Sequence, residues 1–302
     1  MTAEIKPGIY ARDALDYAAI PAINQSLLKW IGKSPLHFKH RQTSPQKTSE
    51  LMRLGSVAHT ATLEPHRLAR DFAVWDQIPT PKKPSQIRAP STKEKKPRRA
   101  GGEYEAFCAM NAGKEILKPE QLEAGLRVAE AVRGNQLAMR YLARGKAEQV
   151  LVWRDEKTGL LCKARLDWLS ESVPDVMLEL KTSGDVSPWA FSGKFAKLGH
   201  HIQCAFYRRG YKTITGRELY AKCAAVESAE PHDVIVYDLA EVIDVGDHYV
   251  GELLEKLDHC NQSGLWLGQS PSSEQTLQLP KWLDPEEDDG NALDDIGLVG
   301  FQ

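Results

Sequence analysis

Apolar residues recur every three or four positions along much of the first 145 residues, which is the spacing of helices that bury one face. The predicted helices cover residues 23–38, 50–63, 102–116 and 119–143. Pro35 is expected to break the first helix, and Glu64-Pro65 to end the second. The segment 76–100 carries five prolines, so we predict an exposed, mobile loop there.

Near residue 147 the pattern changes to short runs in which apolar and polar residues alternate. The predicted strands cover residues 148–154, 160–169, 175–182, 219–226 and 234–239. Further helices are predicted over residues 187–198, 199–214 and 241–262. This order predicts an α/β fold with helices flanking a central sheet and a helical N-terminal elaboration, in one domain over residues 1–270. Residues 271–302 are predicted to form an acidic, flexible tail.

Composition excludes several classes of protein. Hydrophobic residues make up 42% of the 302 residues and charged residues 26%, as in an ordinary globular protein. No stretch approaches the roughly 18 apolar residues of a membrane helix, and the N-terminus does not resemble a signal peptide, so we expect a cytoplasmic location and no membrane partner. The five cysteines are scattered and never form CxxC, which argues against disulfides, a zinc knuckle and an iron–sulfur cluster.

Charge is distributed unevenly although the net charge is only −2. Residues 82–99 hold eight Lys or Arg and one Glu, whereas the last twenty residues hold seven acids and no base. Such blocks are typical of interaction segments, the basic one for a polyanion. They are equally compatible with two solvated surface segments.

Polar residues on two predicted strands can form a catalytic site. Alternation places Leu166 and Trp168 on one face of strand 160–169 and Asp167 on the other, while Glu179 and Lys181 share a face of strand 175–182. If these strands are neighbours, two carboxylates and a lysine converge. Such a group can bind Mg²⁺ and guide an attacking water, as phosphodiester hydrolysis requires. The alternative is an ordinary solvated sheet face.

The order of these residues resembles a nuclease signature. Asp167, eleven intervening residues and then Glu179-Leu180-Lys181 resemble PD-(D/E)XK, and CKARLDWL, LELKTS and HHIQCAFYRRGY resemble the nuclease domain of RecE-type exodeoxyribonuclease VIII. Lambda exonuclease and the RecB nuclease domain are more distantly similar. INQSLLKWIGKSPLHFKH and LMRLGSVAHTATLEP also resemble the RecE-type family, so the resemblance covers residues 20–240. It implies a PD-(D/E)XK core with a central mixed β-sheet.

The resemblance assigns roles to the residues of the signature. Asp167 and Glu179 would be metal-binding carboxylates, with the carbonyl of Leu180 as a backbone ligand. Lys181 would position or activate the attacking water. The implied cofactor is Mg²⁺, for which Mn²⁺ would substitute, and no iron–sulfur cluster is expected.

Residues outside the signature receive roles in the same way. His59, four residues after Gly55, would supply a nitrogen ligand or a contact to a ligand. Gln203 and Tyr207, one helical turn apart, would touch the scissile phosphate or orient Lys181. Glu148, at the start of the first predicted strand, could contribute to a second metal or be only an exposed strand end.

Local positive charge is needed to hold DNA because the chain as a whole is slightly acidic. Ser26 and Lys29 could bind a 5′-phosphate near a helix start, although Ser26 could be only a helix cap. The candidates for contacts to the DNA backbone are Lys95, Lys96, Arg98, Arg99, Arg208 and Arg209.

The resemblance implies a metal-dependent 5′→3′ exonuclease that acts on linear double-stranded DNA. It would leave 3′ single-stranded overhangs for a RecT-like annealing protein in phage or prophage recombination within a bacterial host. A ring-shaped homo-oligomer is expected, with a tetramer favoured over a trimer. Two alternatives stay open: an endonuclease or Cas4-like enzyme on the same core, and a DNA-binding protein that keeps the fold without catalysis.

Overall fold

The computed structural model describes residues 5–11, 13, 16–44, 49–76, 102–269, 274 and 276–277. All the helices and strands below belong to one compact unit, Met1–Trp266. The predicted basic loop lies outside the described residues apart from Asp76, as does nearly all of the predicted acidic tail, so both stay predictions. Within the described ranges, no helix combines the length and the apolar character needed to cross a membrane.

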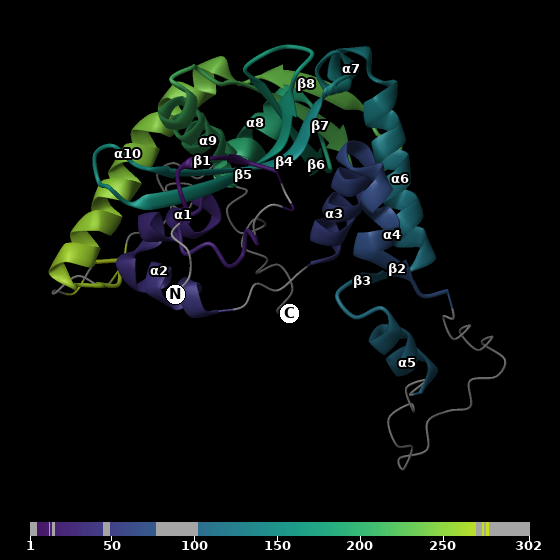
Figure 1. Ribbon diagram of the computed structural model, residues 1–302, viewed down its shortest axis with the longest axis horizontal. Helices are drawn as coiled ribbons and strands as arrows, with labels where there is room; N and C mark the ends of the chain where they lie inside the picture. The colour runs from purple at the N-terminus through teal and green to yellow at the C-terminus, as the bar shows by residue number, and fades with distance from the viewer. Residues whose placement is uncertain are drawn as a thin grey trace, which may run out of the picture. The chain divides into compact units, whose positions relative to one another are not determined.

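A six-stranded mixed sheet forms the centre of this unit (Figure 1). Its strands are β1 (Gly8–Tyr10), β4 (Gly145–Arg154), β5 (Leu161–Ser170), β6 (Val176–Ser183), β7 (Tyr220–Glu227) and β8 (Val234–Asp238), which neighbour one another in that order. Among the described strands of this sheet, β6 and β7 form the one parallel pair. A parallel pair needs a long crossover, which α8 (Pro188–Lys197) and α9 (His200–Thr215) provide. The predicted mixed sheet flanked by helices is confirmed.

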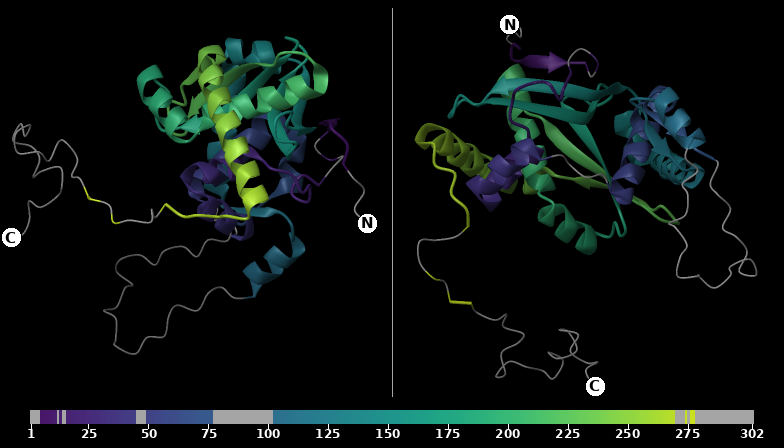
Figure 2. Two further views of the ribbon diagram at one scale, coloured as in Figure 1. Left: turned by 90° about the vertical axis from the view of Figure 1, so that its left-hand side faces the viewer. Right: turned by 90° about the horizontal axis from the view of Figure 1, so that it is seen from below.

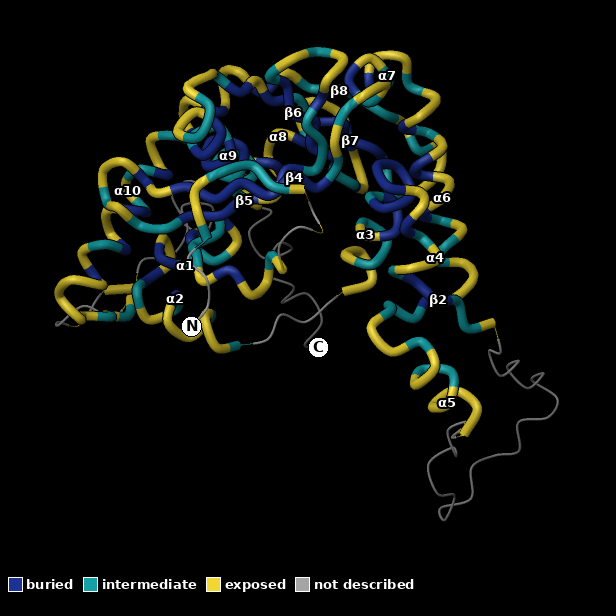
Figure 3. Tube along the Cα trace, viewed as in Figure 1, coloured by how far each residue is buried: buried dark blue, intermediate teal, exposed yellow. Residues whose placement is uncertain are grey.

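Helices cover the sheet on both faces, as the views of Figures 1 and 2 show. One face carries α1 (Gln25–Lys33), α2 (Pro35–Thr43), α8, α9 and α10 (Ala240–Ser263), and the other carries α3 (Glu50–Leu63), α6 (Pro119–Gly134) and α7 (Gln136–Leu142). Strand β7 shows the two cores directly, because Cys223 and Ala225 pack with the first set while Ala224 and Val226 pack with the second. The central strands are accordingly buried on both sides (Figure 3).

Short elements extend the α3 side of the unit. They are η2 (Pro65–Arg67), α4 (Leu68–Asp71), β2 (Phe72–Val74), α5 (Glu103–Met110) and β3 (Glu115–Leu117). The predicted helix over 102–116 is therefore wrong beyond Met110, where Gly113 adopts a positive φ and β3 pairs with β2. The predicted helix over 119–143 is interrupted at Asn135, whose side chain accepts from the Ala138 amide and starts α7.

The N-terminal helices begin where local capping favours them. Asn24 caps α1 by accepting from the Leu27 amide, so the alternative that Ser26 is the cap is wrong. Ser34 caps α2, and Pro35 occupies its first turn, as a residue with a fixed φ and no amide hydrogen can. Helix α3 matches the predicted range 50–63.

The alternation of strand β5 reverses its phase at Asp167. Leu166 packs in the core beside α9, but Trp168 lies on the opposite side, where its indole nitrogen donates to the Tyr141 carbonyl of α7. The prediction that these two residues share a face is therefore wrong. The ladder between β4 and β5 omits the facing pair Glu148 and Asp167, and Glu148 has a φ of 53°. A non-glycine residue in that region is strained, which local packing must offset.

Strands β5 and β6 diverge at the same point. They pair only through Ser170, Leu169 and Trp168, while β6 stays paired with β7 as far as Ser183. Beyond the divergence the edge of β5 pairs with Ile23 instead. The splayed strands leave a gap in the sheet into which the side chain of Asp167 projects, and its carboxylate accepts from the Leu180 amide at 2.9 Å.

Close packing of α3 on α6 fixes the position of His59. A Cβ at Gly125 of α6 would overlap the side chain of Val57, two residues before His59, and lie 3.2 Å from the Ala58 nitrogen.

We predict that Gly125→Ala destabilises the protein by about 1–3 kcal/mol, because a tightly packed contact must open. Gly134→Ala in the same helix meets nothing within 4 Å and is the matched control, expected to be neutral or slightly stabilising. Urea unfolding of both variants tests this; equal stabilities would contradict it.

Candidate active site

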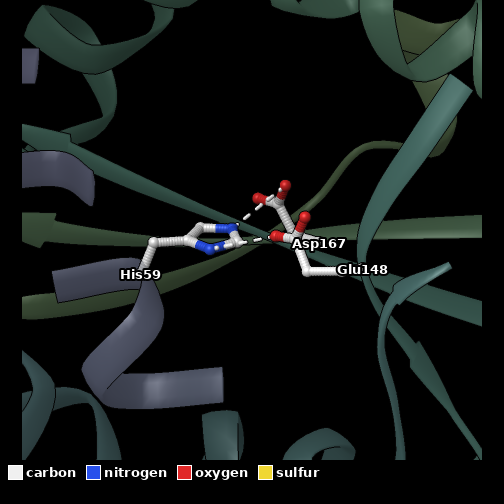
Figure 4. A group of neighbouring side chains, drawn as sticks. All are labelled: His59, Glu148 and Asp167. Atoms are coloured by element: carbon white, nitrogen blue, oxygen red, sulfur yellow. Dashed lines mark ion pairs between the residues drawn. The ribbon is translucent and has the colours of Figure 1, made fainter. Parts of the chain in front are cut away.

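Three side chains, one from α3 and two from the sheet, meet where the alternation of β5 reverses at Asp167 (Figure 4). The Nε2 atom of His59 lies 3.1 Å from Oδ1 of Asp167, and its Nδ1 lies 3.3 Å from Oε1 of Glu148. Helix α3 supplies the imidazole, and the facing positions of β4 and β5 supply the carboxylates. One ligand atom from each of the three residues lies within 4.8 Å of the other two, which is compact enough to surround a metal ion.

The Glu179–Lys181 pair continues the site on β6. The Nζ of Lys181 lies 2.7 Å from Oε2 of Glu179 and 3.8 Å from Oδ2 of Asp167. Glu179 is fully buried, and its Oε1 has no hydrogen-bond partner among the described residues. Asp167 therefore links the two halves of the site, through His59 on one side and Lys181 on the other.

Charge within the site is almost balanced by paired groups. Arg165 lies 2.6 Å from Glu148, so Arg165 and Lys181 oppose the three carboxylates and leave one excess negative charge while His59 is neutral. Burial disfavours the imidazolium form of His59, yet the charges of Asp167 and Glu148 outweigh that effect and raise its pKa above the usual value. A proton on His59 therefore places positive charge between the carboxylates of Asp167 and Glu148, as a bound cation would.

The carboxyl groups respond to the site in opposite directions. Burial would raise the pKa of Asp167, but the neighbouring His59 and Lys181 hold it well below its usual range. Burial and the charge of Asp167 raise the pKa of Glu179 to about 7. Lys181 keeps its proton, because the pKa-lowering effect of burial is exceeded by the attraction of Glu179 and Asp167.

The donor set fits a divalent cation. Carboxylate oxygens suit Mg²⁺ and Mn²⁺, and one imidazole is compatible with the latter in particular. The Oε1 atom of the buried Glu179, which has no hydrogen-bond partner among the described residues, is a further acceptor near Asp167. His59, Glu148 and Asp167 would hold the ion, and the roles of Glu179 and of the Leu180 carbonyl as further metal ligands stay predictions.

A chain of hydrogen bonds on α9 approaches the site from the other core. Gln203 donates from Nε2 to the Tyr207 hydroxyl at 2.7 Å, and Nδ1 of His200 lies 3.1 Å from Oε1 of Gln203. Burial and the Glu179 charge raise the pKa of Tyr207 well above its usual value, so the phenol keeps its proton. Burial, with the charge of Lys181, lowers the pKa of His200 to about 4. Tyr207 is therefore close enough to Glu179 and Lys181 to interact electrostatically with both, and the predicted roles of Gln203 and Tyr207 stay predictions.

A cleft of about 650 Å³ is lined by His59, Glu148, Asp167 and Lys181, together with further residues of α3 and with Lys194 of α8. The exposed side chains of Leu51, Met52 and Leu198 also line it. The cleft is large enough to admit part of a nucleic-acid strand to the carboxylates.

The predicted DNA contacts are dispersed. Arg208 pairs with Asp244 at 2.7 Å, and Arg209 binds Asp247 through two nitrogens, so both arginines fasten α9 to α10. Neither they nor the exposed Ser26 and Lys29 of α1 line the cleft. The remaining candidates, which belong to the basic segment and lie outside the described residues, are Lys95, Lys96, Arg98 and Arg99.

Sequence reasoning missed how Glu148 and Arg165 take part. The sequence leaves open that Glu148 is only an exposed strand end, yet the residue is buried and faces Asp167 directly across the β4–β5 pair. Its register relative to Asp167 was the available signal, because both lie near the same end of a predicted hairpin. Arg165 is two residues before Asp167 on β5 and holds the second oxygen of Glu148.

Comparison with known proteins places this geometry in a family. Residues 24–275 match the family described as a PDDEXK-like domain of unknown function (DUF3799). The chain belongs to this family. A crystal structure of a "putative exonuclease" from Eubacterium rectale is similar, with 13% sequence identity, a TM-score of 0.49, and coverage of 83% of this chain and 91% of that one. A search of curated proteins gave no match.

Membership of the PDDEXK-like family agrees with the chemistry of the cleft. The predicted PD-(D/E)XK core is confirmed, and the chain is a nuclease-type domain. Nucleases of this superfamily use divalent metal ions, for which the His59–Glu148–Asp167 group offers ligands. The roles of the individual residues stay predictions.

Metal binding to this PDDEXK-like site should be pH-dependent. The metal-free fold holds protons on His59, whose pKa is raised, and on Glu179, whose pKa is about 7 rather than 4.5. Both groups bind protons more tightly in the folded than in the unfolded state. The stability that they contribute is lost as pH rises from 4.5 through about 7 for Glu179, and as pH rises above 6.5 for His59. Below the pKa of such a group, an ion that displaces its proton gains about tenfold in affinity for each unit by which the pH rises.

We therefore predict that Mn²⁺ raises the melting temperature more at pH 8 than at pH 6, as measured by thermal unfolding. Asp167→Asn is expected to abolish most of the shift at both pH values. A shift of the same size at pH 6 and pH 8 for the unmodified protein would show that protons and the ion do not compete.

Proposed function

We propose that this chain is a metal-dependent exodeoxyribonuclease that degrades linear double-stranded DNA 5′→3′ and leaves 3′ single-stranded overhangs. The observation that carries the proposal is the convergence of Asp167, Glu179 and Lys181, of which Asp167 and Lys181 line one cleft together with His59. Family membership supports a nuclease. Polarity and preference for duplex ends rest on the resemblance of the Asp167…Glu179-Leu180-Lys181 region to RecE-type exonucleases.

The side chains of the cleft divide the work of hydrolysis. Glu148, Asp167 and His59 would hold Mg²⁺ or Mn²⁺, which when bound supplies positive charge to the scissile phosphate and lowers the pKa of water. Lys181 is held protonated, so it acts as a cation and hydrogen-bond donor that orients the attacking water or stabilises negative charge. Tyr207, oriented by Gln203, keeps its hydroxyl proton and can donate to a phosphate oxygen.

We further propose the setting that the resemblance implies: a ring-shaped homo-oligomer, with a tetramer favoured, acting in a bacterial cytoplasm beside a RecT-like annealing protein. A ring around DNA would retain the substrate despite the modest net charge of −2. Mass measurement in solution, with and without linear duplex, tests the assembly.

Digestion of end-labelled DNA tests the activity. Linear duplex labelled at the 5′ or the 3′ end and a covalently closed circle are incubated with Mg²⁺, with Mn²⁺ and with a chelator. We predict early release of the 5′ label, metal dependence and an intact circle. Cutting of the circle would instead favour an endonuclease, and no cutting with either metal would favour a DNA-binding protein.

Substitution of Lys181 tests the catalytic assignment. We predict that Lys181→Ala lowers the cleavage rate at least about hundredfold, because a positioned donor and charge is lost. DNA affinity should change little, since Lys181 is only 17% exposed and is already engaged by carboxylates. Lys157→Ala is the control, at the opposite end of the β4–β5 hairpin. A Lys181→Ala variant that is folded by thermal unfolding and still cleaves normally would remove Lys181 from the mechanism.

A further inference from the structure

Four side chains that can carry positive charge line the cleft, and they differ in their partners. His59, Arg165 and Lys181 each lie within 3.1 Å of a carboxylate oxygen. The Nζ of Lys194 instead donates to the Ser183 hydroxyl at 3.1 Å, and within the described part of the chain it forms no ion pair. Among the described residues that line the cleft, Lys194 is thus the cation whose charge no acid compensates.

The fold fixes where this charge lies. Phe191 and Phe195 are buried in the core and set the rotation of α8, which leaves Lys194 exposed beside the end of β6. Ser183, its hydrogen-bond partner, is two residues beyond Lys181 on the same strand. Two residues of a strand span about 6.6 Å. Successive phosphates of one DNA strand rise about 3.4 Å along the duplex axis, so the strand spacing between Lys181 and Ser183 corresponds to about two phosphates.

We propose that Lys194 binds a phosphate that neighbours the scissile phosphate on the same DNA strand. The hydroxyls of Ser56 and Thr182, which line the same cleft, would assist it. An ammonium group serves as a point charge for phosphate, and hydroxyls add donors. The other cations cannot take this role without leaving their carboxylates. The inference rests on the proposed function, and the phosphate can be a terminal 5′-phosphate or an internal phosphodiester.

A purely structural role for Lys194 makes a different prediction. If the lysine only joins α8 to β6 through Ser183, its removal lowers stability slightly and leaves the salt dependence of DNA binding unchanged. Phosphate binding, by contrast, releases counterions, so losing one contact makes the slope of log K against log salt less steep by about 0.9 for duplex DNA. The salt slope therefore separates the two roles.

The experiment measures binding of linear duplex to Lys194→Ala, Lys194→Arg, Lys197→Ala and the unmodified protein between 50 and 200 mM salt, in chelator to prevent cleavage. Lys197 is exposed on the same helix but does not line the cleft, so it is the matched control. For Lys194→Ala we expect the affinity deficit to shrink about 3.5-fold across that fourfold salt range. Lys194→Arg should restore most of the slope, and Lys197→Ala should leave it unchanged.

Duplexes with a 5′-phosphate or a 5′-hydroxyl identify the source of the phosphate. A deficit confined to the phosphorylated end indicates the terminal group, and an equal deficit on both ends indicates an internal phosphodiester. Equal slopes for Lys194→Ala and the unmodified protein overturn the inference, as does an equal loss for Lys197→Ala.

Cleavage by the same preparations keeps this inference apart from the proposed function. If the unmodified protein cuts linear duplex and Lys194→Ala binds DNA with the same affinity and salt slope as the unmodified protein, only the inference about Lys194 is overturned. Unmodified protein that shows the Lys194-dependent slope but cuts nothing supports the phosphate contact and removes the exonuclease assignment.

Discussion

The contacts of Asp167 are the constraint on which the site depends. Its carboxylate accepts from the Leu180 amide at the point where β5 and β6 stop pairing, so it replaces part of a ladder that the divergence has broken. The other oxygen reaches His59, and Lys181 lies 3.8 Å from the first. One side chain thereby satisfies the splayed backbone and sets the distance between the α3 imidazole and the β6 lysine. Without the divergence, Asp167 would be an ordinary sheet residue with no gap to project into.

Periodicity predicted the elements better than it predicted their faces. Helix 50–63 and the central strands follow from apolar spacing and from capping residues such as Ser49, which accepts from the Met52 amide. Alternation failed at Leu166 and Trp168 because it assumes extended backbone throughout, whereas Glu148 opposite Asp167 has a positive φ. No pattern of residue types marks a glutamate in that conformation, and the site lies at this irregularity.

The candidate site was predictable to the extent that it follows sequence order. Asp167, Glu179 and Lys181 are separated by one turn, so neighbouring strands bring them together. The predicted roles of Arg208 and Arg209 depended instead on charge alone, and charge in a sequence does not reveal its partner. Asp244 and Asp247, which bind them, lie 36 and 38 residues further along the chain, on a helix whose packing against α9 decides the contact.

The energetically unfavourable features of the fold lie close together, at the candidate site. A strained backbone at Glu148, a buried oxygen of Glu179 without a described partner, and three carboxylates near one another would each destabilise an isolated domain. They persist because two separate cores hold the contributing elements, α3 from one side and α9 from the other. A cation held by His59, Glu148 and Asp167 would bridge α3 and the sheet. Occupancy of the site would for that reason be linked to the stability of the whole unit rather than to that of a single loop.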